Sequence, residues 1–194
     1  MAKKITVLLT YANTHVLGWV RELRNFDVKL KIYCTKSVIH YRKGYFLDLD
    51  DCKDIIYLFK GSCFLEELKK DLAVTDIYIT LGIFDKVFLK TLSGLKDNSK
   101  VFVLSEPFNP ISSKSYVLLR NIVSLFIRIK SNNINFLCIG GLDVKKYYLS
   151  LGFKNCNYYN FGYFPKHEEL HKVETKNKIR FIFVGQLIER KGID

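Results

Sequence analysis

The chain has 194 residues, of which 48% are hydrophobic and 14% aromatic, and its formal net charge is +12. This composition predicts one globular domain with a hydrophobic core, and it excludes both a disordered chain and a bilayer-spanning helix, which needs about 20 consecutive apolar residues. The 5 cysteines include no C-x-x-C pair, so we expect reduced thiols and neither a zinc ribbon nor a secreted disulfide framework.

The first part of the chain alternates strand and helix patterns. Residues 5–10 form a continuous apolar run, which is typical of a strand that is buried on both faces. Asn13 or Thr14 is a suitable cap for a helix with one apolar face that begins just after it. Further strands are predicted at 28–34, near a sheet edge, and at 55–59, and a further helix begins at Ser62.

The second part continues this alternation, with strands predicted at 76–81, 101–104, 135–139 and 157–161 and helices at 85–92, 115–130 and 143–152. The fold class is therefore α/β, a Rossmann-like parallel sheet with helices on both faces. Ligands of such sheets bind beyond the carboxyl ends of the strands, so we expect four loops to face one crevice. These loops follow Thr10, Leu81, Leu104 and Ile139.

The helix at 115–130 is strongly apolar apart from a narrow polar stripe, which consists of Arg120, Asn121, Ser124 and Arg128. We expect it to pack within the layers of the domain. The alternative is that it lies against an anionic membrane with its arginines near phosphates. In that case, Arg120→Glu combined with Arg128→Glu is expected to release the protein from liposomes without unfolding it.

Two titratable residues lie near the predicted crevice. Glu106 follows the strand at 101–104, where it either serves the turn beside Pro107 or orients a hydroxyl nucleophile and acts as its base. His15 follows the first strand, where it is either a surface or capping residue or a member of the same site. We take both as candidate catalytic residues.

No metal site is expected. Residues 167–171 read H-E-E-L-H and match the zinc protease motif, but they lie in a charged segment with no third histidine after them. The Gly140-Gly141 pair lacks the remainder of a dinucleotide-binding motif and is better explained by a tight turn from strand to helix.

The last residues of the chain have a pattern that is suited to binding a phosphate group. An apolar strand begins at Arg180 and runs into Gly185, whose missing side chain would let a ligand approach the backbone. Arg190 and Lys191 then stand at the first turn of a predicted helix, where free N–H groups and the positive end of the helix dipole attract anions. An ordinary basic turn is the alternative.

This ending, F-V-G-Q-L-I-E-R-K-G-I-D at 183–194, resembles the opening of the C-terminal domain of GT-B glycosyltransferases of family 4. A second stretch, from Cys138 to Pro165, resembles the end of the N-terminal domain in the same family. The resemblance implies the N-terminal half of a GT-B fold and a retaining transfer of sugar from a nucleotide-diphosphate donor to a hydroxyl acceptor. It implies no metal and no cofactor beyond the donor.

The resemblance also implies site residues. Gly185, Gln186, Arg190 and Lys191 correspond to the turn that contacts the donor diphosphate. Gln186 replaces the family's usual arginine, for which Arg190 could compensate. Glu106 lies where many members carry a histidine, so the catalytic residue of this half departs from the pattern.

The expected domain organisation is an acceptor-binding domain at 1–165, a linker at 166–178 and the start of a donor-binding domain at 179–194. The family's paired-glutamate signature is absent, so we expect a fragment that is inactive alone.

The implied setting is bacterial surface polysaccharide synthesis in the cytoplasm, at or near the inner face of the membrane, with a glycan or lipid-linked acceptor. The alternative is a non-catalytic module that binds an anionic ligand, such as a lipid-linked diphosphate sugar. Scattered lysines argue against nucleic acid as that ligand.

Overall fold

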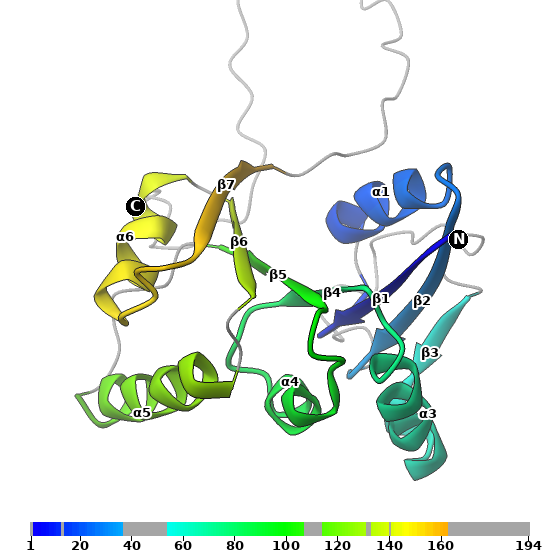
Figure 1. Cartoon of the computed structure of the whole chain (residues 1–194), viewed down its shortest axis with the longest axis horizontal. Helices are drawn as coiled ribbons and strands as arrows, with labels where there is room; N and C mark the ends of the chain where they lie inside the picture. The colour runs from blue at the N-terminus through cyan, green and yellow to red at the C-terminus, as the bar shows by residue number, and fades with distance from the viewer. Residues whose placement is uncertain are drawn as a thin grey trace, which may run out of the picture.

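The computed structural model describes residues 2–12, 14–36, 54–106, 114–130, 133–139 and 141–162. These residues form a seven-stranded sheet in which every pair of neighbouring strands is parallel (Figure 1). The strands are β1 (Lys3–Leu9), β2 (Val28–Cys34), β3 (Ile55–Tyr57), β4 (Ile77–Leu81), β5 (Lys100–Ser105), β6 (Ile134–Ile139) and β7 (Asn157–Phe161).

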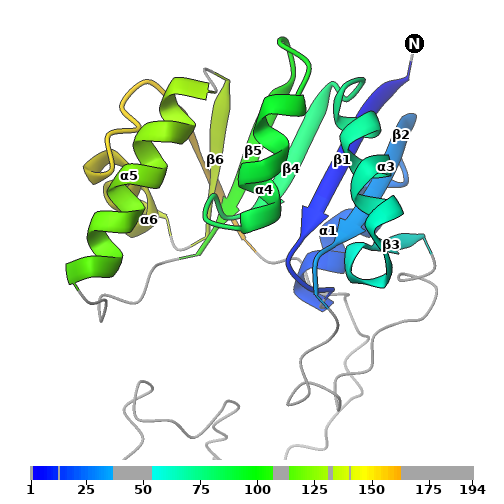
Figure 2. The same cartoon turned by 90° about the horizontal axis from the view of Figure 1, so that it is seen from below.

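The helices cover the two faces of the sheet unequally. Figure 2 shows α3, α4 and α5 side by side across one face, and α6 packs into the same core cluster through Val144 and Tyr148. Among the described helices, only α1 packs into the core of the opposite face. The helices are α1 (Thr14–Leu23), α3 (Ser62–Leu72), α4 (Lys86–Thr91), α5 (Lys114–Lys130) and α6 (Leu142–Ser150).

The strands are ordered β3-β2-β1-β4-β5-β6-β7 across the sheet. The chain therefore moves outward from β1 to β3, crosses back to β4 and continues outward to β7. The direction of winding reverses between β1 and β4, and that reversal is the topological switch point of a doubly wound sheet. The predicted α/β, Rossmann-like fold class is confirmed.

The alternation of side chains along each strand builds two cores. On β1, Ile5, Val7 and Leu9 belong to the core under α1, whereas Leu8 belongs to the core under the other helices. Both faces are apolar because a parallel sheet is covered on both sides, which explains the continuous apolar runs in the sequence.

Most predicted elements are confirmed to within one or two residues, and the differences are local. The predicted third strand, 55–59, ends at Tyr57 and continues as a 3₁₀ turn over Leu58–Lys60. The helix predicted at 85–92 begins at Lys86, because the Asp85 carboxylate caps it by accepting a hydrogen bond from the Val87 N–H at 2.7 Å. The linker and the donor-domain strand, predicted at 166–178 and 179–194, lie outside the described residues.

The helix at 115–130 packs on the sheet as expected, but through a small part of its apolar surface. Of its large apolar side chains that the structure describes, only Val123 and Ile127 face the core, whereas Ser124 of the polar stripe is fully buried. Arg120 also turns inward, and its guanidinium carbon lies 5.4 Å from the ring centre of Phe84. Arg120→Glu would therefore disturb the core, so the substitution expected to leave the fold intact is unsuitable.

Candidate functional site

The carboxyl ends of four neighbouring strands form the candidate site. Strands β1, β4, β5 and β6 are adjacent and parallel, so their exits lie along one edge of the sheet. The four predicted loops thus leave the sheet along a shared edge, and the crevice that we expect them to line stays a prediction. The edge includes the switch point between β1 and β4, where open α/β sheets bind their ligands.

Two glycines turn the chain at this edge. Gly82 follows β4 with φ 73°, and Gly141 precedes α6 with φ 64°, both in the left-handed region that favours glycine. Among the described residues, a side-chain carbon at Gly82 would meet nothing within 4 Å, and one at Gly141 would meet only the Asn160 Oδ1 at 3.9 Å. No described side chain therefore crowds the backbone at either exit.

Glu106 leaves β5 between these two exits, because β5 lies between β4 and β6. Its side chain is exposed. The residue before it is held firmly: the Ser105 Oγ is buried and lies 2.9 Å from the Tyr148 hydroxyl on α6. A carboxylate thus stands on a rigid strand end, where it can accept a hydrogen bond from a ligand hydroxyl.

Tyr148 itself supports the site without taking part in proton transfer. Burial raises the pKa of its phenol well above the ordinary range, and the hydrogen bond with Ser105 opposes this only partly. Its ring stacks on Phe136 with a centroid distance of 4.0 Å, and Phe136 in turn meets Phe153 edge-on at 5.3 Å. Tyr148 and Phe153 belong to the stretch that carries the family resemblance, so in this structure that stretch forms core.

The structure describes only part of the predicted site. The backbone of His15 lies in the first turn of α1, directly after the exit of β1, and its side chain is outside the described part. The residues expected at the donor diphosphate, which are Gly185, Gln186, Arg190 and Lys191, also lie outside it. Glu106 is therefore the predicted site residue whose side chain the structure places.

The described residues support neither a metal site nor a nucleophilic cysteine. No group of three or more His, Cys, Asp or Glu side chains there is arranged to hold a metal ion. Burial raises the pKa of the Cys138 thiol at the end of β6, with Lys145 opposing the shift, so this thiol is not activated as a nucleophile. Within the same residues, no helix is sufficiently long and apolar to cross a membrane.

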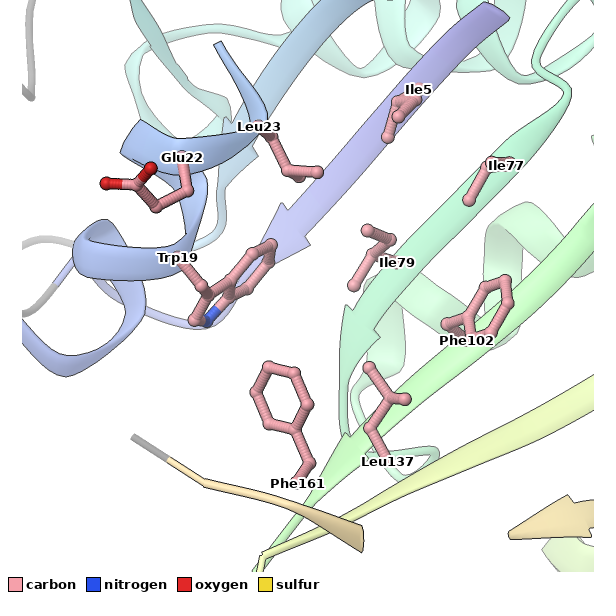
Figure 3. A pocket seen from close by; sticks show the side chains of 9 residues that line it. All are labelled: Ile5, Trp19, Glu22, Leu23, Ile77, Ile79, Phe102, Leu137 and Phe161. Atoms are coloured by element: carbon pink, nitrogen blue, oxygen red, sulfur yellow. The ribbon is translucent and has the colours of Figure 1, made fainter. Parts of the chain in front are cut away.

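A cavity of about 490 Å³ opens on the sheet face that carries α1 (Figure 3). Its walls are apolar side chains of α1 and of five strands, and Figure 3 shows the Glu22 carboxylate turned away from them. The lining consists of Ile5, Trp19, Glu22, Leu23, Ile77, Ile79, Phe102, Leu137 and Phe161. Sequence reasoning missed this cavity, because its residues come from six separate elements and each apolar one reads as ordinary core.

The comparisons with known proteins add little. The chain matches no model of a known protein family and no curated protein. Among solved structures, it is similar to the apo-structure of D-lactate dehydrogenase from Escherichia coli, with a TM-score of 0.39 and 10% sequence identity. The similarity covers 81% of this chain and 43% of the dehydrogenase chain, so this chain spans less than half of that enzyme. At this level the likeness says nothing about activity.

Proposed function

We propose that the chain is the acceptor-binding part of a retaining glycosyltransferase, which moves a sugar from a nucleotide-diphosphate donor to a hydroxyl group. The observation that carries the proposal is the exposed Glu106 side chain, which stands at the carboxyl edge of the sheet between the glycine turns at Gly82 and Gly141. The resemblance of residues 136–194 to family 4 of the GT-B enzymes supplies the reaction class.

The site chemistry follows from the groups at this edge. The Glu106 carboxylate accepts a hydrogen bond from the acceptor hydroxyl, orients it and increases its nucleophilicity as a general base. The backbone at Gly82 and Gly141 leaves room for the flat faces and polar edges of a sugar ring. His15, directly after β1, is the second candidate for contact with the acceptor.

The residues proposed to bind the donor diphosphate are assigned from the family resemblance alone. In the proposal, Gly185 allows the diphosphate to approach the backbone, and Lys191 and Arg190 neutralise its charge. Gln186 contributes an amide where the family usually has a guanidinium, so this turn carries one charge fewer. The lipid-linked or glycan nature of the acceptor and a role in surface polysaccharide synthesis belong to the same proposal.

The test is a nuclear magnetic resonance titration of the isotope-labelled chain with a short-chain prenyl diphosphate sugar. We expect the amide signals of Gly82, Glu106 and Gly141 to shift together. Glu106→Gln should weaken binding several-fold, whereas Glu66→Gln, on the exposed side of α3, should leave it unchanged. Shifts confined to other parts of the chain, or equal binding by the two variants, would contradict the proposal. Tighter binding to a DNA duplex than to the glycolipid would favour a nucleic-acid module instead.

A further inference from the structure

The outer side of α5 is a broad apolar surface. Six of its large apolar side chains are 47–71% exposed. They are Leu118, Leu119, Ile122, Leu125, Phe126 and Ile129, and we refer to them as the α5 apolar face. A surface helix of a globular protein normally turns such a face toward the core.

The inner side of α5 carries the polar groups. Ser124 is fully buried, and its hydroxyl has no hydrogen-bond partner among the described residues. Arg120 lies on the same side, with its guanidinium over the rings of Phe84 and Tyr147 at 5.4 and 5.8 Å. The helix is thus inverted relative to an ordinary amphipathic helix, and this inversion points to a surface that receives an apolar neighbour.

Helical spacing places positive charge at both borders of the α5 apolar face. At about 100° per residue, its six positions span an arc of roughly 120°. Position 130, a lysine, falls about 20° beyond one border of this arc. Position 114, a lysine, falls about 20° beyond the other border, and position 128, an arginine, about 60° beyond it. The arginine at 128 is exposed and donates a hydrogen bond to the Gly152 carbonyl at 3.2 Å. Helix α5 contains no acidic residue.

The charge of the surrounding segment favours a lipid surface over a second copy of the chain as the partner of the α5 apolar face. Between residues 114 and 162, the sequence has 7 lysines and arginines and a single acidic residue, Asp143. A second copy of the chain would therefore bring like charges together across the α5 apolar face. An anionic lipid surface instead offers acyl chains to the apolar face and phosphates to the basic borders.

We propose that α5 lies in the plane of an anionic bilayer surface and docks the chain there through the α5 apolar face. With 17 residues and basic borders, the helix suits the interface rather than a transmembrane position. This inference rests on α5 alone and does not depend on the proposed glycosyltransferase function.

The test is co-sedimentation of the full chain with vesicles of phosphatidylcholine alone or with about one-third phosphatidylglycerol. We expect binding to the anionic vesicles, and Ile122→Gln with Ile129→Gln should weaken it at least tenfold. The matched control is Phe26→Gln with Val74→Gln, which removes two exposed apolar side chains outside α5 and should bind like the wild type. Thermal unfolding of both double variants should match that of the wild type.

Four results would overturn the proposal. The first is absence of binding to anionic vesicles, and the second is equal binding to neutral ones. The third is a concentration-dependent dimer that the α5 variant abolishes, because a second copy would then cover the face. The fourth is a large loss of stability in the α5 variant, because the chain itself would then cover the face.

Discussion

The Ser105 Oγ and the Tyr148 hydroxyl lie 2.9 Å apart in the core and join the carboxyl end of β5 to α6. Both side chains are buried, with 4% and 0% of their surfaces exposed, so neither can replace this hydrogen bond with one to water. The bond fixes the strand end from which Glu106 emerges, and it thereby links the packing of α6 to the position of the candidate carboxylate.

Removing the hydroxyl group of Tyr148 should therefore destabilise the domain and make the backbone at Glu106 more mobile. Tyr148→Phe leaves the Ser105 hydroxyl, among the described residues, with the Glu106 carbonyl at 3.3 Å as its remaining partner, and we expect a loss of about 1 kcal/mol in the free energy of unfolding. Urea unfolding measures this loss, and the amide signal of Glu106 reports the local change. Tyr159→Phe, at a half-exposed tyrosine of β7, is the control. Equal losses in the two variants would show that the hydrogen bond contributes nothing.

Alkaline pH should unfold the domain through its buried tyrosines. Burial raises the pKa of Tyr78 and of Tyr148 far above the ordinary value, so both phenols stay protonated in the folded state. In the unfolded chain they ionise near pH 10. Their contribution to stability is therefore complete below about pH 10 and is lost as the pH rises, by about 1.4 kcal/mol per pH unit for each tyrosine.

Urea unfolding between pH 8 and pH 11 measures this dependence. Tyr78→Phe should make it less steep, because one buried phenol is gone, and the small cost of its 3.4 Å hydrogen bond with Thr91 should appear already at pH 8. An unchanged slope in this variant would rule out Tyr78 as a source of the alkaline sensitivity.

The sequence predicts the sheet well because local pattern and burial agree there. Two parallel strands, 28–34 and 157–161, have the predicted bounds, and the exits of β1, β4, β5 and β6 meet at one edge as expected. Continuous apolar runs occur where both faces of a strand are covered, and glycines mark the exits. The position of Glu106 follows from the same reasoning, because it depends only on strand order and direction.

The orientation of α5 could not be predicted in this way. Periodicity identifies a polar stripe at Arg120, Ser124 and Arg128, but it does not say whether the stripe faces solvent or sheet. In the structure, aromatic rings receive the Arg120 guanidinium, and those rings come from Phe84 and Tyr147, which are distant in sequence. The Ser105–Tyr148 pair was missed for the same reason, since 43 residues separate its members.

Acid should weaken the junction between β1 and β4. The Asp76 carboxylate accepts a hydrogen bond from the Lys4 N–H at 3.0 Å and another from the Lys96 ammonium at 3.4 Å. The Lys4 hydrogen bond, followed by Lys96, lowers the pKa of Asp76 below its ordinary value. The charged form therefore stabilises the fold above about pH 4, and this contribution is lost as the pH falls through the lowered pKa.

Asp76→Asn should consequently be less stable than the wild type at pH 7, with the difference shrinking toward pH 2.5. Urea midpoints at several pH values measure the gap. Asp97→Asn removes a charge from a nearby turn and controls for the change in net charge. A gap of constant size over this range would show that the Asp76 charge does not contribute.

Gly152 is a position where a small substitution should have a clear backbone effect. It ends α6 with φ 88°, in a region where a side chain costs about 1–2 kcal/mol. A methyl group there would also clash with the Nη1 of Arg128. The guanidinium is the end of a flexible side chain and can move away, at the expense of its hydrogen bond to the Gly152 carbonyl. The backbone term should therefore dominate, and Gly152→Ala should lose about 1–2 kcal/mol of stability.

Two further variants separate these causes in urea unfolding. Gly94→Ala is the matched control, because Gly94 has no positive φ and a methyl group there would meet no described atom within 4 Å, so we expect little change or a slight gain. In an Arg128→Ala background, the clash is removed but the backbone strain remains, and Gly152→Ala should lose nearly the same free energy as in the wild type. If the loss disappears in that background, the contact with Arg128, and not the left-handed backbone, requires glycine at the end of α6.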